Sequence, residues 1–182
     1  MACSEYPWYA IVSNDSIEQG DIVSDCPIFE APSDLDIQAL DAKESSVVSF
    51  DYRPYDVIVM SQTCDLVMGR EKLDEVLLCP LYTRLDFDGG VLARLDGWED
   101  ARKGRFPAYH VINQCNLNGH QADFRVVSFR QVFSLPLRFF RNLIKQRQDR
   151  IRLLPPYREH LSQGFARFFM RIGLPVDIPS FK

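Results

Sequence analysis

The stretch that decides the fold is Asp56-Val57-Ile58-Val59-Met60-Ser61-Gln62, which follows Arg53-Pro54. A second stretch of the same kind is Val76-Leu77-Leu78-Cys79-Pro80-Leu81-Tyr82-Thr83. Both are apolar, rich in valine, leucine and isoleucine, and end in small polar residues. Short apolar runs of this kind are typical of buried strands. We therefore predict two buried strands, at whose ends Ser61, Gln62 and Thr83 lie at an edge of a sheet.

The flanking segments extend this sheet. Further strands are predicted at about 21 to 29, 47 to 51, 109 to 112 and 124 to 129. Because proline cannot donate to a strand ladder, Pro27 is expected to break the first of them, which then lies at an edge or contains a bulge. The connections are expected to be an irregular lead-in at 1 to 19, an acidic loop at 30 to 46 and a polar loop at 113 to 123.

Helices are predicted at 91 to 103, with Gly97 as a weak point, and twice after Pro136. The clearest helix follows Pro155-Pro156 and ends before Gly173. Its apolar stripe is expected to pack on the sheet, although an aromatic stripe of this kind also suits a dimer interface. The residues of the stripe are Tyr157, Leu161, Phe165, Phe168, Phe169 and Ile172.

The net charge of -4 hides an uneven distribution of charge. Acidic residues dominate the first third of the chain, whereas the last third is rich in arginine. A basic face permits nucleic-acid binding, but the same residues also suit a solvated surface that pairs with the acidic N-terminal region. The basic residues of the last third are Arg125, Arg130, Arg138, Arg141, Lys145, Arg147, Arg150, Arg152, Arg158, Arg167 and Arg171.

The composition also indicates a compartment. No stretch approaches the roughly 20 apolar residues that a bilayer-spanning helix needs, and no signal-peptide pattern opens the chain. The five cysteines are an odd number without a C-x-x-C pair, which suits a reducing environment. We expect a cytoplasmic protein that does not contact the membrane.

Three short blocks, in this order, resemble the MazF/PemK family of toxin endoribonucleases. They are Gly20-Asp21-Ile22-Val23, Arg53-Pro54 before the strand 57–59, and Pro80-Leu81-Tyr82-Thr83. The run 124–135 and the terminal amphipathic helix are similar to the last strands and closing helix of that family. The chain length of 182 residues fits one domain, residues 1–182. The resemblance implies an α+β fold for it: a small SH3-like β-barrel or strongly bent antiparallel sheet at about 20–135, and C-terminal helices at about 136–175.

The resemblance also implies a reaction. It is metal-independent RNA cleavage, in which a ribose 2′-hydroxyl attacks the adjacent phosphate without a cofactor. Carried over by position, Arg53 is expected to stabilise the transition state and donate a proton, and Thr83 to bind the phosphate. In the structural alternative, Arg53 pairs with Asp51 or Asp56 and Thr83 only ends a strand. The expected substrate-binding residues are Gly20, Asp21, Ser61 and Gln62.

The loop that follows the first buried strand offers a rival site at Cys64 and Asp65. A cysteine just past a strand end can be exposed, and a nearby histidine, His110, His120 or His160, would lower its pKa and make it a nucleophile. An inert thiol is the plainer alternative.

A metal site is a third alternative. Cys115-x4-His120 supplies one loose pair of ligand types, to which Cys64, Cys79 or Cys26 would have to be added. Structural zinc sites usually show two closely spaced pairs. No metal is therefore predicted.

Motifs of several large enzyme classes do not occur in the sequence. It has no Gly-rich phosphate loop, no H-E-x-x-H and no G-x-S-x-G. We predict an RNA-binding protein, with endoribonuclease activity in a bacterial toxin-antitoxin or phage-defence system as the resemblance implies. The expected partners are RNA, a protein partner or antitoxin, and a second copy of the chain. The alternative is a non-catalytic SH3-like protein-interaction module.

Overall fold

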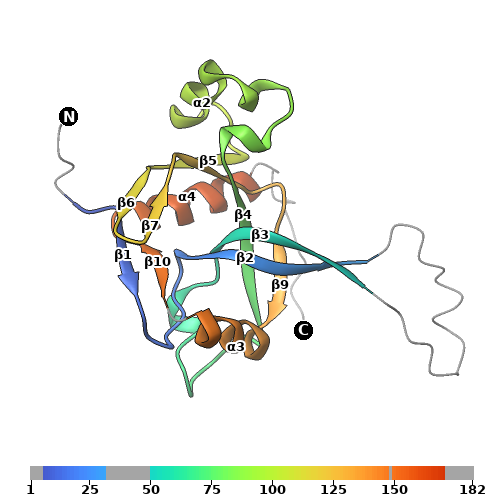
Figure 1. The fold of residues 1–182 in the computed structure, drawn as a ribbon, viewed down its shortest axis with the longest axis vertical. Coiled ribbons are helices and arrows are strands. Elements are labelled where there is room, and N and C mark those ends of the chain that lie inside the picture. The colour runs from blue at the N-terminus through green and yellow to red at the C-terminus, as the bar shows by residue number, and fades with distance from the viewer. Residues whose placement is uncertain (1–5, 32–49, 148, 171–182) are drawn as a thin grey trace, which may run out of the picture.

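The computed structural model describes residues 6–31, 50–147 and 149–170, which form one large sheet, one small sheet and three α-helices (Figure 1). The large sheet consists of β1 (Tyr9–Val12), β2 (Asp21–Glu30), β3 (Asp51–Val59), β4 (Glu75–Tyr82), β5 (Tyr109–Ile112), β8 (Arg125–Ser128), β9 (Phe133–Pro136) and β10 (Arg150–Leu153). The small sheet pairs β6 (Cys115–Leu117) with β7 (His120–Ala122). The helices are α2 (Leu95–Arg102), α3 (Leu137–Arg147) and α4 (Tyr157–Phe169), with 3-10 turns η1 (Thr63–Asp65), η2 (Arg84–Asp86) and η3 (Val91–Ala93).

The strands of the large sheet follow the order β1-β10-β2-β3-β4-β8-β5, and β9 pairs with β4 beside β8. The pairings between described strands are antiparallel. The prediction of an α+β fold with a mostly antiparallel sheet and C-terminal helices is confirmed. Because the outermost strands β1 and β5 do not pair with each other, the described residues form no closed barrel.

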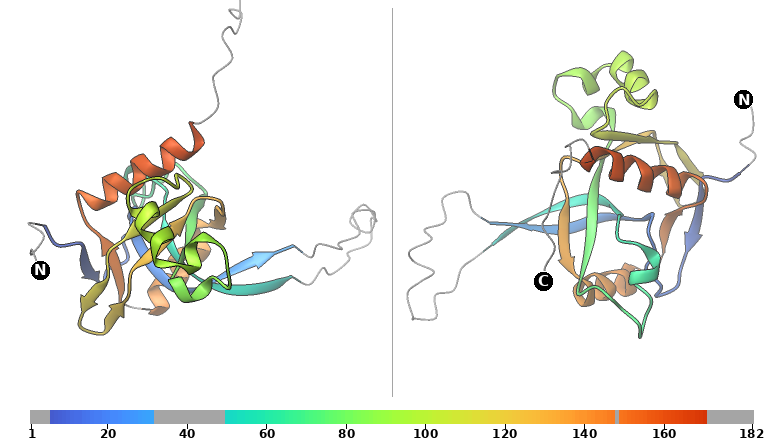
Figure 2. Two further views of the ribbon diagram at one scale, coloured as in Figure 1. Left: turned by 90° about the horizontal axis from the view of Figure 1, so that it is seen from above. Right: turned by 180° about the vertical axis from the view of Figure 1, so that it is seen from behind.

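The apolar run in β3 is buried on both faces of the sheet. Val57, Ile58 and Val59 are each 0% exposed. Val57 and Val59 belong to a core cluster with Phe140 and Ile144 of α3, whereas Ile58 belongs to a second cluster with Leu161 of α4. Since successive side chains of a strand point to opposite faces, α3 and α4 cover opposite faces of the sheet (Figure 2).

Most of the apolar stripe of α4 packs on the sheet as predicted, whereas Phe169 is 55% exposed. Leu161 is fully buried, and Tyr157, Phe165 and Phe168 pack against the same core cluster. The helix begins at Tyr157, directly after the two prolines, as predicted. Ile172 and the predicted end at Gly173 lie outside the described residues.

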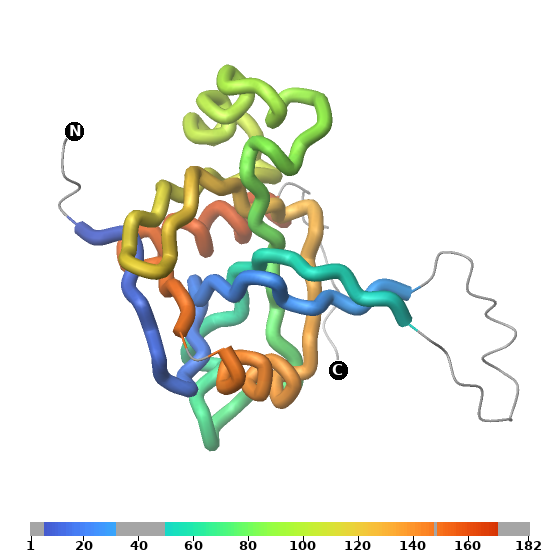
Figure 3. Tube along the Cα trace, in the orientation of Figure 1, coloured from blue at the N-terminus to red at the C-terminus, as the bar shows by residue number. Residues whose placement is uncertain are grey.

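The first strand differs from the prediction because β2 runs through Pro27 without a break. Pro27 lies opposite Pro54 of β3, in the outer half of β2, where β10 no longer pairs with it. β2 does contain a bulge, which was one of the two predicted alternatives, but it lies at the register shift between Val23 and Cys26, with Asp25 at a φ of 48°, and not at Pro27. Beyond the bulge, β2 and β3 leave the body of the molecule as a two-stranded arm (Figure 3).

Two local predictions were wrong, and a third was right only in part. Residues 9–12 of the supposed lead-in form β1, which pairs with β10. The supposed polar loop contains the β6–β7 hairpin, whose turn places Gly119 at a φ of 79°. The helix predicted at 91 to 103 is present in part as α2, whereas residues 91–93 form the separate turn η3. Gly97 lies close against that turn, since a Cβ there would be 2.0 Å from the carbonyl oxygen of Val91.

Residues 32–46 of the acidic loop predicted at 30 to 46 lie outside the described residues, as do residues 47–49 of the strand predicted at 47 to 51. No helix in the described part of the chain has the length and apolarity that a membrane crossing requires.

Candidate functional site

Arg53 and Thr83 lie in separate surroundings. Arg53 is on the arm, opposite Ile28, where its side chain is 71% exposed and its Nε is 3.4 Å from a carboxylate oxygen of Glu30. Thr83 directly follows β4 and precedes η2, and its hydroxyl donates to Oδ2 of Asp86 (2.7 Å), the last residue of η2. The described contacts include no hydrogen bond or ion pair between Arg53 and Thr83. The reason is topological, since the pairing of β3 with β4 ends at Val57 and β3 then turns away with β2.

The expected substrate-binding segments around Gly20 and Ser61 do come together. The backbone N–H of Gly20 donates to the carbonyl of Val59 (2.9 Å), and that of Gln19 donates to the hydroxyl of Thr63 (3.1 Å). Ser61 is buried, and its hydroxyl accepts the backbone N–H of Leu77 (2.8 Å). The Ser61 hydroxyl therefore joins the segment after β3 to β4 within the fold.

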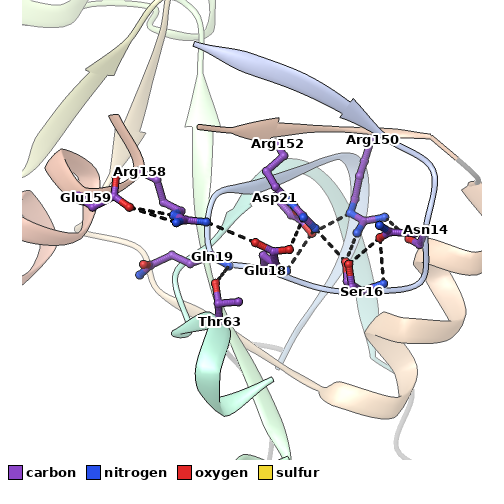
Figure 4. A network of polar contacts seen from close by, with 10 residues as sticks. All are labelled: Asn14, Ser16, Glu18, Gln19, Asp21, Thr63, Arg150, Arg152, Arg158 and Glu159. Atoms are coloured by element: carbon purple, nitrogen blue, oxygen red, sulfur yellow. Dashed lines mark hydrogen bonds and ion pairs between the residues drawn. The ribbon is translucent and has the colours of Figure 1, made fainter. Parts of the chain in front are cut away.

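Asp21 is at the centre of a buried ionic network (Figure 4). It is 0% exposed, and its carboxylate accepts hydrogen bonds from Nε of Arg150 (2.8 Å) and from Nε and Nη2 of Arg152 (3.0 Å for Nη2). The backbone N–H of Glu18 donates to the same carboxylate (3.0 Å). The network holds the turn before β2 against β10 and leaves the Asp21 carboxylate out of reach of solvent.

The uneven charge distribution is largely balanced inside the molecule. Arg158 of α4 also joins the network, because its Nη1 is 3.4 Å from Glu18. Lys145 of α3 lies 3.5 Å from Asp15, and Nη2 of Arg147 donates to the backbone carbonyl of Asp25. For these residues the prediction of pairing between the basic C-terminal third and the acidic N-terminal region is confirmed.

Arg125 is a cation of the core. Its side chain is 5% exposed and its Nη1 is 3.5 Å from Asp56, while its Nε and Nη2 have no acceptor among the described residues. Because it is enclosed between strands, Arg125 adds nothing to a basic face.

Cys64 is exposed and lies in a polar cavity of about 430 Å³, named here the Cys64 pocket. Its Sγ is 3.5 Å from Oδ1 of Asp65, whose pKa is lowered by the hydrogen bond from Lys72. None of the described residues that line this cavity is a histidine, so the rival nucleophile has no adjacent base of that type. The residues that line it include Gln19, Gln62, Thr63, Arg158, Glu159, Ser162 and Gln163.

The zinc alternative has no ligand set in the described part of the chain, where no group of three or more His, Cys, Asp and Glu could hold a metal ion. Cys26 and Cys79 are core residues, and burial raises the pKa of their thiols to about 11 and about 12. Cys115 is likewise buried, on the strand next to that of His120.

A cavity of about 590 Å³ between α2, β5 and α4 contains two histidines, and we name it the histidine pocket. Its polar lining is almost entirely cationic or aromatic, and none of its described lining residues is acidic. A site of this composition suits an anionic ligand with aromatic groups. The lining residues on which the argument depends are Arg102, Lys103, Phe106, Tyr109, His110, Phe129, His160, Gly164 and Arg167.

His110 sits on β5 directly beneath α4. Its ring packs near Phe129, with 6.3 Å between ring centroids, and a Cβ at Gly164 would lie 3.3 Å from its Nδ1. Burial, and to a smaller extent the neighbouring His160, lower the pKa of His110 to about 4. His110 is therefore neutral near pH 7. His160 is exposed on α4, one turn before Gly164.

The cations around the histidine pocket differ in how they are paired. Arg102 and Lys103 both contact Glu99, at 2.7 and 3.0 Å. Arg167 is exposed and has no ion-pair partner among the described residues. Arg130 lies with its guanidinium carbon 5.5 Å from the centroid of the Tyr109 ring. Unpaired positive charge thus remains beside this pocket, whereas most of the other C-terminal arginines are neutralised.

Sequence reasoning considered His110 and His160 only as activators of Cys64, and it missed the pocket that they share. The signals available were Gly164 in the middle of a strong amphipathic helix, where glycine costs about 1 kcal/mol relative to alanine, and the surplus of arginine nearby. Neither signal shows which strand the helix covers.

Comparison with known proteins gave no match of the chain to any family model, curated protein or solved structure.

Proposed function

We propose that this protein binds single-stranded RNA, with the histidine pocket as the principal contact. The observation that carries the proposal is a cavity that combines unpaired cationic charge with aromatic rings and lacks acidic lining residues. Proteins that bind single strands use basic side chains along the phosphate backbone and aromatic faces for the bases. Here Arg167 supplies the cation, and the rings of Phe106 and Tyr109 supply the aromatic faces.

The MazF/PemK resemblance supports RNA as the ligand. On that basis we also propose metal-independent endoribonuclease activity, in the cytoplasm of a bacterium and within a toxin-antitoxin or phage-defence system. The open antiparallel sheet is then a divergent relative of the SH3-like barrel. These further parts of the proposal depend on the three short sequence blocks.

Fluorescence anisotropy with a labelled single-stranded RNA tests RNA binding. Each phosphate contact contributes a slope of about -0.7 to the plot of log K against log salt concentration, so Arg167→Ala is expected to weaken binding and make the slope shallower by about 0.7. Arg138→Ala is the matched control, because Arg138 is an exposed arginine on α3, which covers the opposite face of the sheet. Absence of salt-dependent binding, or equal losses in both variants, would refute the proposal.

A protein-interaction module is the second candidate, and exposed aromatic side chains on the arm favour it. Tyr52 and Phe29 are 63% and 51% exposed and pack against each other, with 6.3 Å between ring centroids. Phe139 of α3 continues the cluster, 5.8 Å from Phe29. Sedimentation velocity over a range of concentrations tests the second copy of the chain as the partner, and Tyr52→Ser is expected to reduce self-association.

A further inference from the structure

We propose that His110 and His160 form an acid–base pair that cleaves RNA in the histidine pocket. The inference depends on the proposed RNA binding and identifies the reacting groups. It places the chemistry beneath α4, away from Arg53 and Thr83.

The two imidazoles lie on the same side of α4. His160 and Gly164 are four residues apart on the helix and therefore share a face. Because Gly164 has no side chain, the ring of His110 approaches the helix there, and His110 and His160 line one cavity. The glycine that weakens the helix is the residue that makes room for His110.

Arg167 continues the same helical face. It is three residues beyond Gly164 and seven beyond His160, and it lines the same cavity. A guanidinium at this position would contact the phosphate oxygens, on which negative charge increases in the transition state of phosphodiester cleavage.

The surroundings of the two histidines assign their roles. His110 is enclosed by Phe129, α4 and the neighbouring His160, which keep its ring neutral near pH 7, as a general base requires. A phosphate bound beside it adds an opposite charge, which raises its pKa and strengthens it as a base. His160 is open to solvent and is the group left to act as general acid. The other titratable groups of the pocket are Arg102, Lys103, Tyr109 and Arg167.

The reaction balances without any further reactant. His110 accepts the proton of a ribose 2′-hydroxyl while that oxygen forms a bond to the adjacent phosphorus. The bond from phosphorus to the 5′-oxygen breaks, and protonated His160 donates its proton to that oxygen. The products are a 2′,3′-cyclic phosphate and a 5′-hydroxyl, with His110 protonated and His160 neutral until they exchange protons with water.

The experiment follows a labelled single-stranded RNA in EDTA, with cleavage and anisotropy measured on the same samples. Wild-type protein is expected to give cyclic-phosphate ends. His160→Ala and His110→Asn are expected to lower the cleavage rate, measured at protein concentrations where anisotropy shows the RNA fully bound, by about 100-fold or more, as loss of general acid–base catalysis does. Added imidazole is expected to restore part of the rate of His160→Ala, which a merely structural role would not allow. Because His160 is exposed, that variant is expected to fold normally.

Three results would overturn the inference. Wild-type protein that binds RNA without cleaving it refutes the histidine pair and leaves the proposed RNA binding intact. If His160→Ala cleaves RNA at the wild-type rate and Arg53→Ala does not cleave it, the reaction takes place at the arm and not in the histidine pocket. An RNA that neither binds nor is cleaved refutes the RNA-binding proposal itself, and the histidine pair with it.

Discussion

Replacement of Asp21 by alanine tests the buried ionic network. The carboxylate is fully buried and is the acceptor that Arg150 and Arg152 share, so its removal leaves two largely buried guanidinium groups without their main counter-charge. Breaking a buried ion pair by removing one partner costs about 3–5 kcal/mol. Against a total free energy of unfolding of about 5–15 kcal/mol, this is a large part of the stability of the protein.

The effect is measurable by urea unfolding and by thermal denaturation. For a chain of this size, 1 kcal/mol corresponds to about 2–4 °C in Tm, so Asp21→Ala is expected to lower Tm by about 6–20 °C. The control is Asp15→Ala, which removes an exposed pair with Lys145 and is expected to cost less than about 1 kcal/mol.

A triple variant separates the charge effect from a packing effect. Asp21→Leu with Arg150→Met and Arg152→Met removes all three charges, and it is expected to recover most of the stability that Asp21→Ala loses, since apolar groups of similar volume can replace a buried ion cluster. A loss of less than 1 kcal/mol in Asp21→Ala would show that Arg150 and Arg152 are compensated elsewhere, and the reasoning would be wrong.

Three further predictions concern thiols, pH and the helix glycine. Of the four described cysteines, Cys64 alone is expected to react with a maleimide in the native protein at pH 7.5. The thiols of Cys26, Cys79 and Cys115 are buried, and burial also raises the pKa of the first two. Peptide mass spectrometry identifies the labelled cysteine. The pKa of His110 is about 4 in the folded protein and about 6.5 in the unfolded chain. The free energy of unfolding is therefore expected to fall by at most about 3 kcal/mol as the pH decreases from about 6.5 to 4. Urea unfolding midpoints of His110→Gln, measured over the same pH range, should lack that part of the pH dependence. Gly164→Ala places a Cβ 3.3 Å from Nδ1 of His110, so RNA affinity is expected to fall although helix propensity improves by about 1 kcal/mol, and unchanged affinity would contradict the close packing.

The central strands and the last helix were predictable because their signals are local. A few consecutive residues are enough to indicate which surface is buried in the apolar runs of β3 and β4 and in the stripe of α4. β10 was missed, because Arg150 and Arg152 look like solvated residues until Asp21, about 130 residues earlier, is placed beside them. Burial of a charge depends on a partner that no local pattern contains.

In the candidate site, too, contacts between residues far apart in the sequence could not be predicted from local patterns. Gly20 and Ser61 were expected among the substrate-binding residues, and backbone hydrogen bonds from Gln19 and Gly20 do bring these two segments together. The histidine pocket depends on how α4 folds back over β5, so His110 and His160, 50 residues apart in sequence, carry no signal of their proximity.

Photo-crosslinking of a 4-thiouridine-containing single-stranded RNA, followed by mass spectrometry of the crosslinked peptides, tests the central claim that RNA lies in the histidine pocket. Crosslinks are predicted at Phe106 and Tyr109 and in the α4 peptide that contains His160 and Arg167, with their yield reduced in Arg167→Ala. Crosslinks confined to the β2–β3 arm, or none in the histidine pocket, would contradict the account.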